Sequence, residues 1–475
     1  MEFHVSLIDR KNLSGEIYRQ IRGAILDGRL RPKDALPSTR DLARALSVSR
    51  TTVMVAFDRL AGEGFVFSRR GAGTFVSEHV ARRGNQPPTL KVEGALRARR
   101  VWESIPLPSA FVRRAEYDFR TGLPDTSLFP YERWRRLMPS ARDSDDSRFG
   151  GYDGPAGHPA LRAAIARHIG TSRGVEASAD DVIVTNGTQQ AIDVIARVLL
   201  APGDRVAVED PGYAPARRVF KSHGARIVGV PVDGNGLVVD ALPNNIRLVY
   251  VTPSHQYPLG VPLSLPRRRQ LLSWAERNRA AIIEDDYDTE FRFDGRPIEP
   301  LRTLDTTGRV IYVGSFSKTL LPALRMGFMT TPASLRAAVH TAKAVMDWHT
   351  STLPQIALAR FIDDGSFARH IRRAGRVYRE RHAVVVDTLA RRFTEQLELV
   401  PSAAGLHVAA LARNASVERI AEVLGRASDA GIEVQALASF AAGRRARVGL
   451  VIGYGGIATT RIEEGLRRLR RCFDA

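Results

Sequence analysis

The segment VGSFSKTLLPALRMGF, residues 313–328, sets one lysine among groups that could hold an anion. An apolar run ends at Ser315 and Ser317, with Lys318 beside them and Arg325 seven residues further on. A lysine amine forms a Schiff base with an aldehyde when its surroundings let it lose a proton. Hydroxyl groups and a guanidinium group bind phosphate oxygens. The segment therefore predicts covalent chemistry at Lys318 next to a phosphate-binding site.

Three further segments carry polar groups at the ends of apolar runs, where α/β sheets bind ligands. TNGTQQA opens a helix whose unpaired N–H groups favour an anion. IIEDDYDTEF supplies a carboxylate and a hydroxyl, and EDPGY supplies an aromatic ring that could stack on a flat ligand. The candidate residues in these segments are Gly187, Thr188, Gln189, Asp285, Tyr287 and Tyr213.

Pyridoxal 5'-phosphate (PLP) matches this set of groups. It offers an aldehyde and a phosphate, and proteins hold it with a lysine, an acid at the pyridine nitrogen and a phosphate-binding loop. Each segment alone has a simpler explanation, because an SFSK sequence is usually a loop and an acidic strand end is usually solvated. Four such segments at successive strand ends favour a PLP site.

The elements that carry these residues follow an alternating order. Short β-branched runs, from DVIVT to RVIYVGS, are separated by helical patterns such as QQAIDVIARVLL and PRRRQLLSWAERNRA. This order predicts an α/β domain over residues 117–475, with a mostly parallel sheet covered on both faces. We expect a larger part over about residues 150–345 and a smaller C-terminal part over about residues 346–475.

Residues 1–78 have a different texture. SGEIYRQIRGAILDG spaces Ile17, Ile21 and Ile25 along one helical face. STRDLARAL and SRTTVMVAFDRLAGEG each follow a serine that can cap a helix, and FVFSRRGAGTFVSE reads as two strands with glycines at their turn. Two short helices, a tight turn and this hairpin predict a winged helix-turn-helix, which is mainly α-helical with a β wing.

The same residues suit duplex DNA. The second helix of such a motif meets base edges with its first turn, where arginine pairs with guanine and threonine reaches phosphate or a thymine methyl. The net charge of +19 agrees with an anionic partner. A small helical domain with a solvated basic face is the alternative. The candidate DNA-contacting residues are Arg40, Ser49, Arg50, Thr51, Thr52, Arg69 and Arg70.

Residues 79–116 are basic, contain several prolines and lack periodicity, which indicates a linker between the two domains. The hydrophobic fraction of 44% is typical of a globular protein, and no run of eighteen apolar residues occurs. The first residues, MEFHVSLIDR, lack the apolar core of a signal peptide. With a single cysteine, Cys472, we expect a cytoplasmic protein that has no membrane partner.

Two family resemblances follow from these motifs. LPSTRDLARALSVSRTTVMVAFDRLAGEGFVFSRRGAGTFV resembles the winged helix of GntR-type bacterial regulators. GYDGPAGHPALR, TNGTQQA, EDPGY, IEDDYD and SFSKTLLPALRMG are similar, in order and spacing, to fold-type I aminotransferases. Their combination, with TPSHQYPLG, resembles the MocR-type subfamily of GntR regulators.

The resemblance implies roles for individual residues. Lys318 would be the Schiff-base lysine, Asp285 would pair with the pyridine nitrogen, and Arg325 would bind the phosphate. Tyr152 would reach the phosphate of a partner subunit, because these sites form between two chains in a head-to-tail, domain-swapped homodimer. The GntR resemblance implies that five N-terminal residues contact operator DNA: Arg40, Arg50, Thr51, Thr52 and Gly71.

The sequence departs from the aminotransferase pattern at two places. Tyr257 stands where these enzymes carry an asparagine that bonds the phenolate oxygen of PLP, and it is itself a candidate cofactor-binding residue. Val451 stands where they carry an arginine that binds the substrate carboxylate, and Arg447, four residues earlier, is a candidate substitute.

Three functions remain open at this stage. The first is a transcriptional regulator whose operator binding responds to PLP or to an amino compound held at the aminotransferase-like site. The second is a PLP-dependent aminotransferase with an accessory DNA-binding domain, and both departures argue against efficient turnover. The third is a DNA-binding protein whose aminotransferase-like half serves only for dimerisation.

Overall fold

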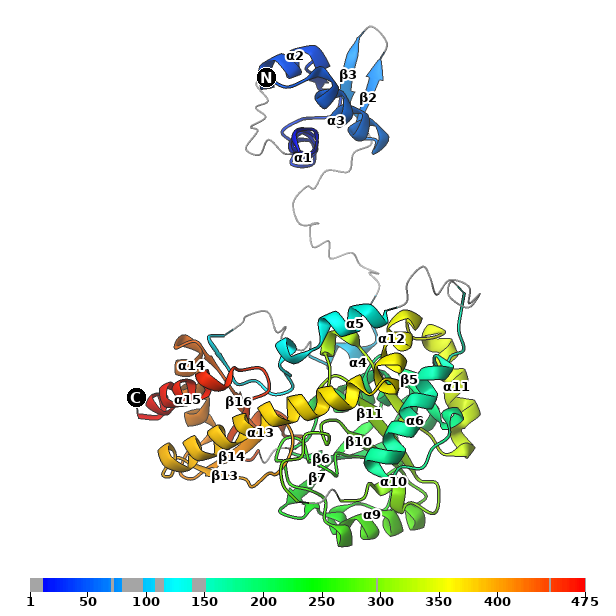
Figure 1. Cartoon of the computed structure of the whole chain (residues 1–475), viewed down its shortest axis with the longest axis vertical. Helices are drawn as coiled ribbons and strands as arrows, with labels where there is room; N and C mark the ends of the chain where they lie inside the picture. The colour runs from blue at the N-terminus through cyan, green and yellow to red at the C-terminus, as the bar shows by residue number, and fades with distance from the viewer. Residues whose placement is uncertain are drawn as a thin grey trace. The chain divides into compact units, whose positions relative to one another are not determined.

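The computed structural model describes residues 12–69, 72–78, 97–106, 115–138, 151–295, 298–443 and 446–474. Figure 1 shows the chain, which divides into two compact units, Met1–Arg97 and Ala98–Ala475. Within the described ranges, no helix is long and apolar enough to cross a bilayer.

The first unit combines short helices with a small antiparallel sheet of order β1-β3-β2. Apolar residues at helical spacing on α1 and α3, such as Ile17, Ile21, Val53 and Phe57, share one buried core. The elements are α1 (Leu13–Leu26), β1 (Ala35–Leu36), α2 (Thr39–Leu46), α3 (Arg50–Gly62), β2 (Val66–Arg69) and β3 (Gly73–Val76). The predicted winged helix-turn-helix is confirmed.

The second unit is built on an eight-stranded sheet of order β5-β12-β11-β10-β9-β6-β7-β8. The inner strands β11, β10, β9, β6 and β7 run parallel, as predicted from the alternation of strands and helices. The strands are β5 (Val182–Thr185), β12 (Gly327–Thr330), β11 (Val310–Ser315), β10 (Ala281–Asp286), β9 (Leu248–Val251), β6 (Arg205–Asp210), β7 (Arg226–Asp233) and β8 (Gly236–Leu237).

Helices cover both faces of this sheet, and its central strands are therefore buried on both sides. One face packs on α7 (Thr188–Leu199), α8 (Ala214–Ser222) and α11 (Ala333–Asp347). The other packs on α6 (Pro159–Arg173), α9 (Leu265–Asn278), α10 (Leu301–Leu304) and α12 (Thr352–Asp363). The predicted α/β architecture is therefore confirmed.

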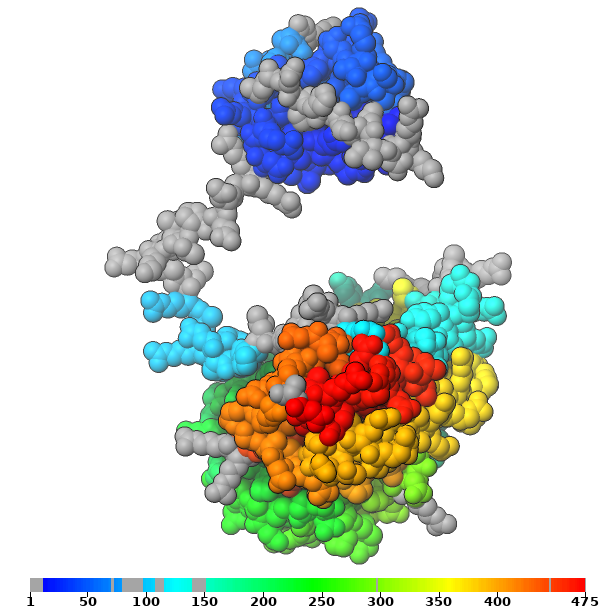
Figure 2. All heavy atoms as spheres, turned by 90° about the vertical axis from the view of Figure 1, so that its left-hand side faces the viewer, coloured from blue at the N-terminus to red at the C-terminus, as the bar shows by residue number. Residues whose placement is uncertain are grey.

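The C-terminal part of this unit has its own antiparallel sheet, β13-β14-β17-β16, and its own core. Figure 2 shows the atoms of this part, gold to red, together on the face of the unit that is turned to the viewer. Its elements are α13 (Ser366–Arg392), β13 (Leu397–Leu399), β14 (His407–Ala412), α14 (Val417–Asp429), β15 (Ile432–Glu433), β16 (Gln435–Ala436), β17 (Gly449–Gly453) and α15 (Thr459–Asp474). Strand β15 pairs with β4 (Tyr117–Asp118) near the start of the unit, where α4 (Arg100–Glu103) and α5 (Tyr131–Leu137) also lie.

Candidate functional site

Lys318 follows β11 directly, and its ammonium group is removed from bulk water. The Lys318 Nζ donates to the main-chain oxygen of Gly122 at 2.8 Å. A Cβ on Gly122, whose φ is +80°, would stand 3.2 Å from that nitrogen, so this glycine allows the close approach. Burial lowers the pKa of Lys318, while the charges of Asp288 and Asp285 oppose that shift. An amine that loses its proton more readily is a better nucleophile.

Asp285 lies on the neighbouring strand β10, which pairs with β11 in parallel. Its Oδ2 accepts a hydrogen bond of 2.5 Å from the Tyr250 hydroxyl. Its Oδ1 is buried and has no hydrogen-bond partner among the described residues. Burial raises the pKa of Asp285 to about 7. A buried acceptor without a donor is costly, so this oxygen fits a ligand that brings an N–H group with positive charge.

The phosphate-binding residues predicted from sequence also come together. Helix α7 begins at Thr188, and its N-cap, Gly187, has φ 75° and provides no side-chain cap, which leaves N–H groups open to an anion. The Arg325 Nη2 donates to the Asn186 oxygen at 3.0 Å and would lie 3.0 Å from a Cβ on Gly187. The next strand, β12, pairs with β11 so that Gly327 lies opposite Ser315.

The loop that joins β11 to β12 completes this anion-binding region, which we call the anion cup. The Ser315 hydroxyl accepts a bond of 3.1 Å from the main-chain N–H of Ser317, which fixes the turn that leads to Lys318. A Cβ on Gly327 would approach Gly187 within 2.8 Å, so a glycine at position 327 allows this contact between segments. Gln189 has an exposed side chain, and its neighbour Gln190 instead binds the Asn186 N–H at 2.7 Å.

Three tyrosines predicted for the site lie around this centre. The rings of Tyr213 and Tyr257 meet edge to face with centroids 5.6 Å apart. The Tyr257 hydroxyl is 2.6 Å from the Thr121 hydroxyl. The Tyr287 hydroxyl lies 3.0 Å from His255 Nδ1, a partner that the sequence did not indicate.

Two predicted residues lie apart from these contacts. Tyr152 is 84% exposed, and its ring packs on Trp348 at a centroid distance of 5.1 Å. Arg447 donates to the main-chain oxygen of Val232 on β7. Val451 is buried in an apolar cluster with Leu259 and other side chains.

Sequence reasoning missed several residues of the centre. His255 and Asp288 lie inside the quoted motifs TPSHQYPLG and IIEDDYDTEF, whose polar character was the available signal. His407 and Gly122 come from remote segments and carry no local signal. Atoms of His255, Asp288 and His407 that could ligate a metal lie within 4.8 Å of one another. Hydrogen bonds already engage them, because His255 bonds Asp288 and Ser402 and His407 bonds the Pro258 carbonyl.

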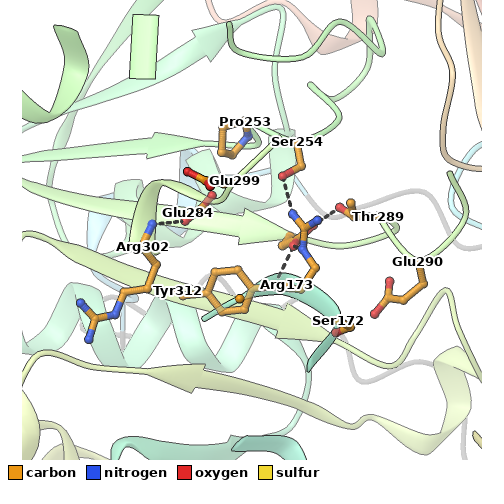
Figure 3. A network of polar contacts seen from close by, with 12 residues as sticks. Ser172, Arg173, Pro253, Ser254, Glu284, Thr289, Glu290, Glu299, Arg302 and Tyr312 are labelled. Carbon is orange, nitrogen blue, oxygen red and sulfur yellow. Dashed lines mark hydrogen bonds and ion pairs between the residues drawn. The ribbon is translucent and has the colours of Figure 1, made fainter. Parts of the chain in front are cut away.

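A buried arginine holds the loops behind the centre in place. The Arg173 Nε lies 2.7 Å from Asp286 Oδ2, and its Nη2 donates to the Ser254 hydroxyl at 2.8 Å. Figure 3 shows the guanidinium group pointing to Ser254, with Tyr312 and Thr289 nearby. Both of these side chains donate hydrogen bonds to Asp286.

This network fixes two segments at once. Ser254 precedes His255, and Asp286 follows Asp285. Burial alone would lower the pKa of Arg173, but the Asp286 carboxylate raises it overall, so the guanidinium keeps its charge. Arg173 therefore joins the segment after β9 to the end of β10.

The first unit presents the predicted DNA-contacting residues on α2, α3 and the hairpin. The Ser49 hydroxyl accepts from the Thr52 N–H at 3.1 Å and caps α3. Arg50 is exposed on the first turn of α3, and its Nε donates to the Thr39 hydroxyl at 3.4 Å. Exposed side chains of the set also include Arg40, Thr51 and Arg69. Arg70 and Gly71 lie outside the described residues.

Comparison with known proteins agrees with both units. Residues 13–76 match the family described as bacterial regulatory proteins, gntR family, and residues 118–452 match aminotransferase class I and II. The chain is 38% identical to the probable rhizopine catabolism regulatory protein MocR of Rhizobium meliloti, over 97% of this chain and 93% of that protein. The chain belongs to the MocR-type subfamily of GntR regulators.

Further relatives of this MocR-type regulator agree. It is 33% identical to the pyridoxine biosynthesis transcriptional regulator PdxR of Corynebacterium glutamicum, over 93% of this chain and 91% of that protein. A kynurenine aminotransferase of Pyrococcus horikoshii, solved with PMP, matches with a TM-score of 0.70 and 27% identity, over 80% of this chain and 95% of that chain. The protein is thus a DNA-binding transcriptional regulator with a fold-type I aminotransferase-like domain, as the sequence predicted.

Proposed function

We propose that this MocR-type regulator binds PLP at Lys318 and that its operator binding responds to PLP, or to an amino compound held at the same site. The observation that carries this proposal is the meeting of three groups around adjacent strands. These are the desolvated amine of Lys318, the unpaired buried oxygen of Asp285, and the anion cup of Arg325 and Gly187. A ligand with an aldehyde, a protonated ring nitrogen and a phosphate fits all three.

The other site residues have supporting roles in this proposal. Ser315, Ser317 and the N–H groups of Thr188 and Gln189 would bind phosphate oxygens, the Tyr213 ring would lie against the cofactor ring, and Tyr257 and Tyr287 would offer hydroxyls. The bound cofactor would supply a carbonyl that reacts reversibly with amines. Ligand control then requires that the bound molecule favours one of two conformations that differ in operator affinity.

Replacing Arg325 with glutamine should weaken PLP binding about 10- to 100-fold, because hydrogen bonds to a charged group contribute about 1.5–3 kcal/mol. A titration of cofactor-free protein followed by absorbance measures this loss. Arg197→Gln is the matched control, since Arg197 is half exposed and pairs with Asp193. Equal affinity in wild type and Arg325→Gln would exclude Arg325 from the phosphate site.

We infer that the active form is a homodimer in the cytoplasm with head-to-tail exchange between subunits. Tyr152 and Trp348 pack on each other and are 84% and 59% exposed, which supports a subunit contact there. Tyr152 would then reach the phosphate of the partner's cofactor. A dimer carries two winged helices, so its operator should contain paired half-sites.

Replacing Arg50 with alanine should weaken specific operator binding about 10- to 100-fold, because a bidentate arginine–guanine contact contributes about 1–3 kcal/mol of discrimination. Fluorescence anisotropy with operator and with unrelated duplex at one salt concentration measures both affinities. Arg29→Ala, an exposed arginine paired with Asp27 outside α2, α3 and the hairpin, is the control. An unchanged ratio between the two duplexes would remove Arg50 from the recognition set.

A working aminotransferase is the second candidate function. The likeness to the Pyrococcus horikoshii enzyme, together with Lys318 and Asp285, favours it. The buried apolar surroundings of Val451 and the bond from Arg447 to Val232 argue against a carboxylate clamp at those residues. Steady-state formation of a keto acid from common amino donors would support this candidate over a sensor without turnover.

A further inference from the structure

A buried histidine–aspartate pair lies beside Lys318. His255 Nδ1 is 3.0 Å from Asp288 Oδ1 and 3.1 Å from Oδ2, and both side chains are 1% exposed. His255 follows β9 and Asp288 follows β10, so the two neighbouring segments of the site meet in this pair. Asp288 is near enough to Lys318 for its charge to raise the pKa of the amine, against the effect of burial.

The C-terminal part of the domain fixes the other side of the histidine ring. His255 Nε2 lies 3.0 Å from the Ser402 hydroxyl, which in turn donates to the Ala404 carbonyl at 3.2 Å. A serine has a single hydroxyl hydrogen, and a carbonyl can only accept. The hydroxyl hydrogen serves one of these two contacts, and in either case Ser402 holds the Nε2 side of the ring in place.

The contacts with Asp288 place a hydrogen on the opposite ring nitrogen, Nδ1. An ionised carboxylate only accepts, so the contacts with Asp288 require an N–H on that side of the ring. Nδ1 therefore carries a hydrogen that points to Asp288 and cannot accept one from the Tyr287 hydroxyl, which lies 3.0 Å away. The hydroxyl then keeps its own hydrogen for another partner. Burial and Asp288 raise the pKa of Tyr287 well above its ordinary value, so this hydrogen is retained.

Two glycines show that the pair is closely enclosed. Gly260 and Gly405 have φ values of +82° and +87°. A Cβ on Gly405 would stand 2.1 Å from His255 Cε1 and 2.6 Å from Asp288 Oδ2, and a Cβ on Gly260 would stand 2.8 Å from Ser402 Oγ. The main chain of both parts of the domain therefore holds the pair, and side chains at either glycine would displace it.

We propose that the His255–Asp288 pair is a positioning element that keeps the Tyr287 hydroxyl hydrogen available to the phenolate oxygen of PLP, in place of the asparagine that is absent at position 257. The inference rests on the proposed binding of PLP at Lys318. His255 acts through Tyr287 and is a positioning residue. Other titratable groups that face the pair are Lys318, Asp285, Tyr257, His382, His407 and Tyr454.

The test is a pH titration of the visible absorbance of PLP-loaded, full-length protein. Loss of a hydrogen-bond donor leaves the negative charge of the PLP phenolate oxygen less stabilised. A proton held next to that oxygen is then released only at a higher pH. Tyr287→Phe should therefore raise the pH midpoint by about one to two units, the range of a hydrogen bond to a charged group. In a His255→Gln background the hydroxyl turns to Asp288, and the same Tyr287→Phe change should shift the midpoint by less than about half as much.

The four proteins of this cycle separate the possible outcomes. Equal shifts in both backgrounds, or no shift from Tyr287→Phe in the wild-type background, would overturn the inference. Absence of any visible band in the wild type would instead overturn the proposed cofactor.

Asp193→Asn is the matched control, because its pair with His223 is also histidine–aspartate, at 2.5 Å, but lies in the groove between α7, α8 and α11. Its midpoint should equal that of the wild type. If His255→Gln does not fold, Ser402→Ala supplies a milder background in which the Tyr287→Phe shift should also shrink, and an undiminished shift there would equally contradict the inference.

Discussion

Replacing Lys318 with alanine should abolish the visible absorbance band that forms when PLP is added to purified protein. The buried amine of Lys318 is the nucleophile that the site provides, and its lowered pKa reflects removal from water near Asp285 and Arg325. Without it the cofactor could be held only by non-covalent contacts with the anion cup. Absorbance spectra recorded after removal of unbound PLP measure the effect.

The control for Lys318 must be another lysine, because PLP also reacts with surface amines. Lys221 is exposed on α8 of the same unit. Lys221→Ala should keep the full band, with an unchanged pH dependence. A band that survives in Lys318→Ala and disappears in Lys221→Ala would contradict the assignment of the covalent site.

Replacing Arg173 with methionine should destabilise the second unit by about 3–5 kcal/mol, because it leaves the buried Asp286 carboxylate without its cation. The side chains of Arg173 and Asp286 are 7% and 4% exposed. Urea denaturation followed by tryptophan fluorescence measures this unit selectively, since all four tryptophans of the chain lie beyond residue 97.

A matched variant on the surface distinguishes burial from charge loss. Arg391 pairs with Asp387 on α13, with side chains 53% and 62% exposed. Arg391→Met should leave the free energy of unfolding close to that of the wild type, because exposed ion pairs contribute little to stability. If both variants lose the same stability, the network around Arg173 does not hold the loops as described.

The parts of the protein that depend on neighbouring residues could be predicted from the sequence. Ser49 caps α3 as its position before the helical pattern indicated, and the apolar spacing of Ile17 and Ile21 matches a buried face. Buried parallel strands have near-continuous apolar runs, so β10 and β11 were visible as IIED and VIYVGS. Asp285 at the end of β10 and Lys318 shortly after β11 could therefore be predicted as candidate site residues.

The parts that depend on remote contacts could not be predicted. Ser402 lies 147 residues from His255, and only the folded chain brings them together. Arg173 ends a helix that carries no sign of its partner Asp286. Strand β12 is antiparallel between β5 and β11 and has only four residues, so its sequence GFMT gave no periodic pattern.

An operator-binding titration with and without PLP, on wild type and Lys318→Ala, tests most directly whether the cofactor controls DNA binding. We expect PLP to change the operator affinity of the wild type by at least about fivefold, the lower range of ligand coupling, and to leave that of Lys318→Ala unaffected. The same change in both proteins, or an unchanged affinity in wild type that carries the visible band, would contradict it.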